Sequence, residues 1–315
     1  MSTAASASSA APVTSASAPA SPERTFGSLA PAMITPFHED GSLDTATAQE
    51  LARRLVDQGC DTILLSGTTG ESPTTHQPEK DELTRAVVDA VGDRAFVLCG
   101  AGSNDTAHAV RIAQSAQACG ADGLLVVSPY YNRPSQAGLV AHVRAIADAT
   151  DLPIMLYDIP GRTGLAFSDA ALDQLAAHPR IRAVKDATGD VPQGATRMQR
   201  TGLAYYSGDD ALNYLWLAEG ASGVISVVAH VAAVHYRRLI DLVDAGQWGQ
   251  ARELAHALDP LVHAIMGGGQ GAVLAKWALH LQGVLPSPAV RLPLVAPDPP
   301  AIAALRAAME ALDLL

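Results

Sequence analysis

Short apolar runs and Ala-rich amphipathic stretches alternate along this chain from about residue 29 onward. Each apolar run ends in a loop of Gly, Pro or polar residues, and a stretch with helical periodicity follows it. The runs are AMITPF (32–37), TILLSG (62–67), AFVLCG (95–100), GLLVVSP (123–129), PIMLYDIP (153–160), IRAVKD (181–186), LAYYSG (203–208) and GVISVV (223–228). Continuous apolar strands that alternate with helices indicate a parallel sheet covered by helices.

The stretches between these runs carry helix start and stop signals. Thr45 leads into an amphipathic segment that closes on Gly59, and Ser168 leads into one that stops at Pro179. Eight strand–helix units favour a closed (β/α)₈ barrel of the TIM type over an open doubly wound sheet, so the predicted fold class is α/β. Three or four further helices are expected after the last strand, at 231–245, 247–266, 271–283 and 299–314.

These patterns divide the chain into three parts: a tail at 1–24, a barrel at 25–229 and a helical C-terminal extension at 230–315. The tail consists almost entirely of Ala, Ser, Pro and Thr, and such a segment buries too little surface to order itself. It lacks the basic start and Leu-rich core of a secretory signal. A transit peptide would be rich in Arg, but this segment has no Arg before Arg24. We therefore expect a disordered tail.

Composition narrows the classes of function. Hydrophobic residues make up 48% of the 315 residues, yet no apolar run has the length of a membrane span. The net charge of −11 argues against nucleic acid and anionic membranes as partners. Cys60, Cys99 and Cys119 have no metal or redox spacing, which favours buried, reduced thiols in a cytoplasmic protein. The histidines form no HExxH motif or similar cluster, so no metal site is expected.

The candidate chemistry lies where the predicted strands end, because a barrel of this kind collects those ends at one working face. GTTGES (67–72) follows the second strand, PYYNRPS (129–135) the fourth, YDIPGRTG (157–164) the fifth and SGDD (207–210) the seventh. Five of the seven tyrosines lie in or beside these segments, namely Tyr130, Tyr131, Tyr157, Tyr205 and Tyr206.

The sixth strand carries a lysine, Lys185, although the chain otherwise prefers Arg. Only three of its 21 basic residues are lysines, the others being Lys80 and Lys276. Arg stays protonated in proteins, whereas a desolvated Lys can become a neutral amine. A neutral amine can attack a ketone, lose water and leave an iminium that makes the neighbouring carbon acidic. Tyr and Thr hydroxyls could carry the protons that this reaction moves.

Each of these features also has a purely structural interpretation. Lys185 could extend from a strand end toward solvent, and the Tyr cluster could be a packed rim. GTTGES and GRTG (161–164) could be plain turns. GAGSND (100–105) is placed like a dinucleotide-binding turn, but Asp105 stands where that motif has Gly or Ala.

In this order, the motifs resemble those of the pyruvate-dependent class I aldolase family, to which N-acetylneuraminate lyase belongs. GTTGES, PYYNRPSQAG, the YxxP of the fifth strand, KDATG and SGDD all fall at family positions, and the match runs from about residue 27 to the C-terminus. GRTG resembles the motif at this position in the synthase branch of the family, in which the Arg binds the carboxylate of aspartate semialdehyde. The sugar-acid lyases generally lack that Arg.

The resemblance assigns a role to each candidate residue. It implies that Lys185 forms a Schiff base with pyruvate, with no other cofactor. It also implies that the remaining residues form a proton relay (Tyr157, Thr68 and Tyr131), a pocket for pyruvate (Thr69, Gly208 and Ile225) and a site for the second substrate (Arg162). Members of the family are usually homo-oligomers, often tetramers of tight dimers, in which the second Tyr of the YY pair reaches into a neighbouring subunit.

The implied reaction is the condensation of pyruvate with L-aspartate 4-semialdehyde on the route to diaminopimelate and lysine. Two alternatives remain: a sister aldolase or dehydratase that acts on a sugar acid or another 2-keto acid, and a non-catalytic relative that kept the barrel. One departure is visible, because many relatives read YNxP where this chain has Asp158 after Tyr157. On a regular strand Asp158 points away from Tyr157, so we expect little effect on the chemistry.

Overall fold

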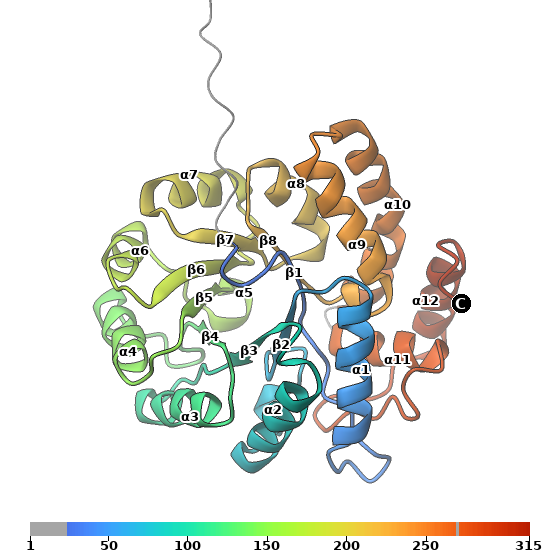
Figure 1. Ribbon diagram of the computed structural model, residues 1–315, viewed down its shortest axis with the longest axis horizontal. Helices are drawn as coiled ribbons and strands as arrows, with labels where there is room; N and C mark the ends of the chain where they lie inside the picture. Colours follow the sequence, from blue (N-terminus) through green and yellow to red (C-terminus); the bar gives the residue numbers. More distant parts are fainter. Residues whose placement is uncertain (1–23, 269–270) are drawn as a thin grey trace, which may run out of the picture.

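The structure, a computed structural model, describes residues 24–268 and 271–315 as a barrel of eight parallel strands surrounded by helices (Figure 1). The strands are β1 (Leu29–Pro31), β2 (Thr62–Leu65), β3 (Phe96–Gly100), β4 (Gly123–Val127), β5 (Ile154–Asp158), β6 (Ile181–Asp186), β7 (Ala204–Ser207) and β8 (Gly223–Ser226). Their hydrogen-bonded order is β1-β8-β7-β6-β5-β4-β3-β2. A single bridge between Ala32 and Leu64 joins β1 to β2. The predicted (β/α)₈ barrel is confirmed.

The first strand lies earlier in the chain than the apolar pattern indicated. We expected it at 32–37, but only Leu29–Pro31 pairs with β8. Farther along, the backbone N–H of Ile34 donates to Nε2 of His230 at 2.9 Å instead of to a strand. Residues 32–37 are apolar because they are buried where the chain leaves the barrel, and burial alone does not distinguish such a segment from a strand.

The helices that cover the barrel begin close to the predicted signals. They are α1 (Thr45–Asp57), α2 (Gln77–Val91), α3 (Thr106–Ala118), α4 (Gln136–Asp148), α6 (Asp169–Ala176), α7 (Val191–Thr201) and α8 (Asn213–Ala218), together with the short turns η1 (Ser72–Thr74), α5 (Pro160–Thr163) and η2 (Asp210–Leu212). Ser168 caps α6 as expected, accepting a hydrogen bond from the N–H of Ala171. For α1 the cap is Asp44 rather than Thr45.

Four helices follow β8 in the described part of the chain, the upper of the three or four that the sequence predicted. They are α9 (Ala229–Asp244), α10 (Trp248–Met266), α11 (Gly271–Leu281) and α12 (Pro299–Glu310). Helix α9 packs against β1 and β8, α10 packs against α9, and α12 packs against α10 and α11 on one side of the barrel (Figure 1). The proposed boundary at 229/230 stays a prediction. The predicted tail lies outside the described residues, apart from Arg24.

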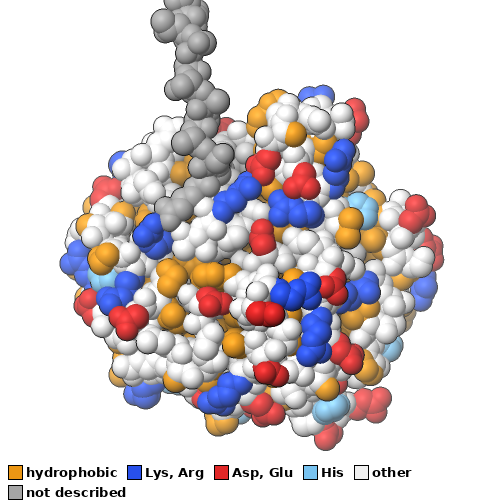
Figure 2. All heavy atoms as spheres, in the orientation of Figure 1, with side chains coloured by type: hydrophobic (Ala, Val, Ile, Leu, Met, Phe, Trp, Pro, Cys, Tyr) orange, Lys and Arg blue, Asp and Glu red, His pale blue; other side chains and the backbone are white. Residues whose placement is uncertain are grey.

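The described residues also show where the cysteines and the charged side chains lie. Cys60, Cys99 and Cys119 are buried and unpaired. Among residues 24–268 and 271–315, no helix is long and apolar enough to cross a membrane, and no group of His, Cys, Asp or Glu could hold a metal ion. On the face drawn in Figure 2, acidic and basic side chains are interspersed. Arg24 and Asp244 form one surface ion pair, at 2.8 Å.

Two carboxylates are buried on the outer side of the barrel, between β5, β6 and α7. Asp158 and Asp186 are each 1% exposed and occupy paired positions on adjacent strands. Oδ2 of Asp158 lies 3.8 Å from a guanidinium nitrogen of Arg197 and accepts a hydrogen bond from the N–H of Phe167 at 3.4 Å. Burial, and secondarily the neighbouring Asp186, raise the pKa of Asp158 to about 7.

This raised pKa predicts an unusual dependence of stability on pH. Between about pH 4 and pH 7 the folded state holds a proton on Asp158 that the unfolded state releases, so this group lowers the free energy of unfolding as pH rises. Asp158→Asn removes the effect. We expect its Tm advantage over the wild type to grow from pH 5 to pH 8 in thermal unfolding.

Asp169→Asn is the matched control for Asp158→Asn, because Asp169 also contacts Arg197. Its carboxylate accepts a hydrogen bond from Nε of Arg197 at 2.8 Å, which lowers the pKa of Asp169. Asp169 is therefore ionised throughout pH 5 to 8, and the Tm difference caused by Asp169→Asn should be constant over that range. A constant Tm difference for Asp158→Asn as well would contradict the raised pKa.

Candidate active site

Lys185 lies at the centre of the candidate site, near the carboxyl end of β6. The register pairs it with Tyr157 on β5 and with Tyr206 on β7. The residue is only 6% exposed, and Nζ lies 4.2 Å from the centre of the Tyr157 ring. Alternation along β6 places Lys185 inside the barrel and Asp186 outside it. Lys185 is therefore not a lysine that extends into solvent.

Burial changes the acidity of this amine. The pKa of Lys185 is lowered to about 8, chiefly by desolvation; the carboxylate of Asp210 opposes this shift, and the nearby charge of Arg162 adds to it. At neutral pH, roughly a tenth of the amine would then be neutral, whereas an ordinary lysine would be protonated almost completely. The environment thus favours a nucleophilic amine.

Asp210, which opposes the lowering of the Lys185 pKa, is a buried carboxylate. Its carboxylate accepts hydrogen bonds from the hydroxyl of Ser226, from the N–H groups of Val227 at 2.8 Å and Val228 at 3.2 Å, and from the amide of Asn213 at 3.0 Å. These bonds tie the SGDD segment to the end of β8. The SGDD motif was expected at the working face, but no role was predicted for Asp210. The pair of acidic residues at the end of a strand was the available signal.

Tyr157 provides a protonated hydroxyl beside the amine. The side chain is 6% exposed, and burial raises the pKa of its hydroxyl to about 12. The hydroxyl therefore keeps its proton at neutral pH and can donate a hydrogen bond. Together, Tyr157 and Lys185 place a proton donor and a nucleophile on adjacent strands.

The GTTGES turn (67–72) forms another wall of the site. Its backbone is held by a hydrogen bond from the hydroxyl of Thr35 to the carbonyl of Gly70 at 2.7 Å. Within the described residues, no hydrogen bond uses the backbone N–H of Thr68 or Thr69. Two N–H groups and two hydroxyls are therefore available to bind a carboxylate.

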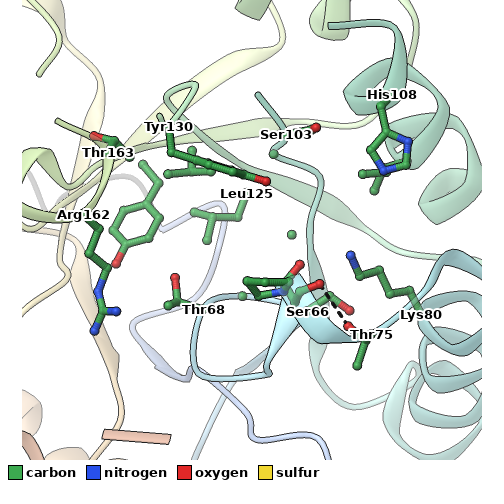
Figure 3. Close-up of a pocket in the computed structure, with 18 of the residues that line it drawn as sticks. Ser66, Thr68, Thr75, Lys80, Ser103, His108, Leu125, Tyr130, Arg162 and Thr163 are labelled. Carbon is green, nitrogen blue, oxygen red and sulfur yellow. Dashed lines mark hydrogen bonds between the residues drawn. The ribbon is translucent and has the colours of Figure 1, made fainter. Parts of the chain in front are cut away.

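The turn borders two adjoining cavities. The larger, of about 470 Å³, is lined by Thr68, Tyr157 and Arg162 among others, and the smaller, of about 200 Å³, by Thr68, Thr69 and Arg162. Figure 3 shows Arg162 and Thr68 on one side of the larger cavity and Lys80 with His108 on the opposite side. Arg162 belongs to α5, a single turn that directly follows β5, and so lies at the junction of both cavities.

Four predicted residues line neither cavity: Lys185, Gly208, Ile225 and Tyr131. Lys185 nevertheless lies beside the larger cavity, because its Nζ is 4.2 Å from the ring of Tyr157, which lines it. Gly208 lies against Lys185 instead: a Cβ at this position would be 3.0 Å from Cγ and Cε of the lysine. Ile225 is buried on β8. The side chain of Tyr131 is 90% exposed, and its backbone has a φ of 74°, a conformation uncommon for a bulky residue. Within one chain, Tyr131 therefore points away from the site.

The glycines of GAGSND (100–105) have a packing role in this structure. A Cβ on Gly100 would lie 2.3 Å from the carbonyl oxygen of Ser66, directly before the GTTGES turn. A Cβ on Gly102 would lie 2.4 Å from a methyl group of Val127. These glycines allow β3 to approach the turn and β4 closely, which accounts for the motif without a dinucleotide.

Comparisons with known proteins agree with this geometry. Residues 25–312 match the Dihydrodipicolinate synthetase family. The 4-hydroxy-tetrahydrodipicolinate synthase of Mycolicibacterium paratuberculosis is 52% identical over 291 residues, which are 92% of this chain and 96% of that protein.

Two solved structures have closely similar folds. Dihydrodipicolinate synthase from Cyanidioschyzon merolae with lysine bound is 40% identical, with a TM-score of 0.88 over 93% of this chain and 100% of the other. The dihydrodipicolinate synthase from Acinetobacter baumannii complexed with pyruvate is 33% identical, with a TM-score of 0.88 over 92% and 100%. By sequence and by structure, this chain belongs to the dihydrodipicolinate synthetase family.

Proposed function

We propose that this chain is a Schiff-base lyase that condenses pyruvate with L-aspartate 4-semialdehyde to form 4-hydroxy-tetrahydrodipicolinate. The observation that carries the proposal is the buried Lys185 amine, whose pKa is lowered to about 8, beside the protonated Tyr157. The similarity to synthases over nearly the whole chain supports it. The only covalent carrier is Lys185 itself, without a cofactor.

The first half of the reaction would use the amine and the hydroxyl together. The neutral Nζ of Lys185 attacks C2 of pyruvate, and Tyr157 donates a proton to the oxygen, which leaves as water. Loss of a proton from C3 converts the resulting iminium to an enamine. Thr69 and the turn's backbone hold the pyruvate carboxylate. Gly208 lies against the Lys185 side chain that carries the adduct, and with Ile225 it would border the bound pyruvate.

The second half of the reaction would use Arg162. Its guanidinium binds the carboxylate of aspartate semialdehyde and places the aldehyde near the enamine, whose C3 attacks it. The amino group of the bound product then attacks the C2 iminium, which closes the ring and releases Lys185. Pyruvate and the semialdehyde thus combine with the loss of one water.

The proposed proton relay requires a second subunit. Tyr131 is 90% exposed in one chain, so it could join Tyr157 and Thr68 only in the site of a neighbouring copy. We therefore propose a homo-oligomer, a tetramer built from tight dimers, in the cytoplasm. Unpaired, buried Cys60 and Cys99 fit a reducing compartment.

The Schiff base can be tested by reduction with borohydride. In the presence of pyruvate, the protein should gain the mass of one reduced pyruvyl group, located on Lys185 by peptide mass spectrometry. Lys185→Arg should abolish the adduct because a guanidinium stays protonated, whereas Lys80→Arg should retain it. An adduct on Lys80 or Lys276 would refute the assignment.

Two further substitutions separate chemistry from substrate choice. Tyr157→Phe keeps the ring but removes the proton carrier, so kcat should fall by roughly 10²- to 10⁴-fold. Arg162→Ala should chiefly raise KM for aspartate semialdehyde, while borohydride still traps pyruvate. Steady-state kinetics with aspartate semialdehyde and a panel of sugar-acid aldehydes would measure both effects. An unchanged KM for aspartate semialdehyde, or faster turnover of a sugar-acid aldehyde, would favour a sister aldolase.

A further inference from the structure

A buried ion pair joins the GTTGES turn to the C-terminal extension. Lys276, on α11, is completely buried, and its Nζ donates to Oε1 of Glu71 at 2.5 Å and to the carbonyl of Ala289 at 2.7 Å. The other oxygen, Oε2 of Glu71, accepts the backbone N–H of Arg291 at 2.9 Å. Both oxygens of this turn carboxylate are therefore held by residues more than 200 positions later in the chain.

The side chain of Arg291 extends the same network around the turn. Its guanidinium donates to the carbonyl of Thr74 at 2.7 Å, to that of Gly41 at 2.7 and 2.9 Å, and to the carboxylate of Glu79. Both the Lys276 ammonium and the Arg291 guanidinium lie 4.2 Å from the centre of the Phe37 ring, where a cation is attracted to the aromatic face.

The position of Glu71 explains why this network bears on the site. Its φ is 55°, in the left-handed region that a residue with a side chain seldom adopts, so surrounding contacts must hold it there. Its N–H donates to the carbonyl of Thr68 at 3.1 Å. The conformation of Glu71 therefore sets where Thr68 and Thr69 present their N–H groups and hydroxyls.

Stability alone is a weak reason for such a pair. Removing two charges from water is costly, and a well-packed apolar pair of similar volume often folds at least as well. A fixed geometry for the turn is a stronger reason, because an ion pair has defined donor and acceptor positions whereas an apolar contact does not. The arrangement also assigns a structural role to Lys276. Its amine is hydrogen-bonded to the carboxylate of Glu71, whereas the amine of Lys185 has no such carboxylate bond among the described residues.

We propose that Lys276 and Arg291 are positioning residues, which hold the GTTGES turn through Glu71 in the conformation that binds the pyruvate carboxylate. The inference rests on the proposed function, since it assigns that carboxylate to Thr69 and the turn. The C-terminal extension thus contributes to substrate affinity, although no side chain of this network needs to touch pyruvate.

The test compares Lys276→Met, Glu71→Gln and the double variant with the wild type. For each, the pyruvate concentration that gives half-maximal borohydride trapping is measured on intact protein, below that variant's Tm. We expect this half-saturating pyruvate concentration to rise roughly 10- to 100-fold in Lys276→Met, because a small misplacement of the groups that bind pyruvate is sufficient for such an effect. The double variant removes the unpaired charge and should fold better than Lys276→Met, yet still bind pyruvate weakly.

Arg237→Met is the matched control. Arg237, on α9, also ties the helices after β8 to the barrel, through Ser28 at 2.9 Å and Asp61 at 3.4 Å, but at the amino ends of the strands. This variant should lose stability without a change in half-saturating pyruvate. If Lys276→Met does not accumulate as folded protein, the isosteric Glu71→Gln decides the question in the same assay.

The outcomes separate this inference from the proposed function. A wild type that gives no adduct would overturn both. A wild type trapped on Lys185, with half-saturating pyruvate unchanged in the folded variants, would overturn the positioning role alone. A parallel increase in Arg237→Met would also overturn it, because general loosening of the fold would then explain the result.

Discussion

Desolvation of one amine is the constraint on which the rest of this site depends. Lys185 lies near the end of a strand, inside a closed barrel where little water can stabilise its charge, and its pKa is therefore lowered to about 8. The same enclosure raises the pKa of the neighbouring Tyr157 to about 12. One physical cause thus prepares a nucleophile and a proton donor side by side, without a metal cluster in the described residues.

The strict alternation of strand residues separates this chemistry from the structural ionic groups. Tyr157 and Lys185 face the interior of the barrel, while the next residues, Asp158 and Asp186, face the helices outside. A carboxylate pair is therefore kept on the opposite side of the two strands from the amine. This arrangement supports the expectation that Asp158 has little effect on the chemistry.

Much of this molecule could be predicted from local sequence patterns. Seven of the eight apolar runs contain a strand of the barrel, and the preference for Arg drew attention to Lys185, because both signals are local. The displaced first strand was missed because residues 32–37 are as apolar as a strand. The Glu71–Lys276 pair was missed for another reason: it joins residues 205 positions apart, and only the folded chain brings them together. Likewise, the family resemblance implied a relay role for Tyr131, but the exposure of its side chain is a property of the folded chain.

The central claim is that burial makes Lys185 reactive near neutral pH, and the pH dependence of Schiff-base formation tests it most directly. The rate of pyruvate adduct formation would be followed by timed trapping and intact-protein mass, from about pH 6 to pH 11. The account predicts that the rate rises with an apparent pKa of about 8 and then levels off. A rate that continues to rise through the pKa of an ordinary lysine, about 10.4, would contradict it.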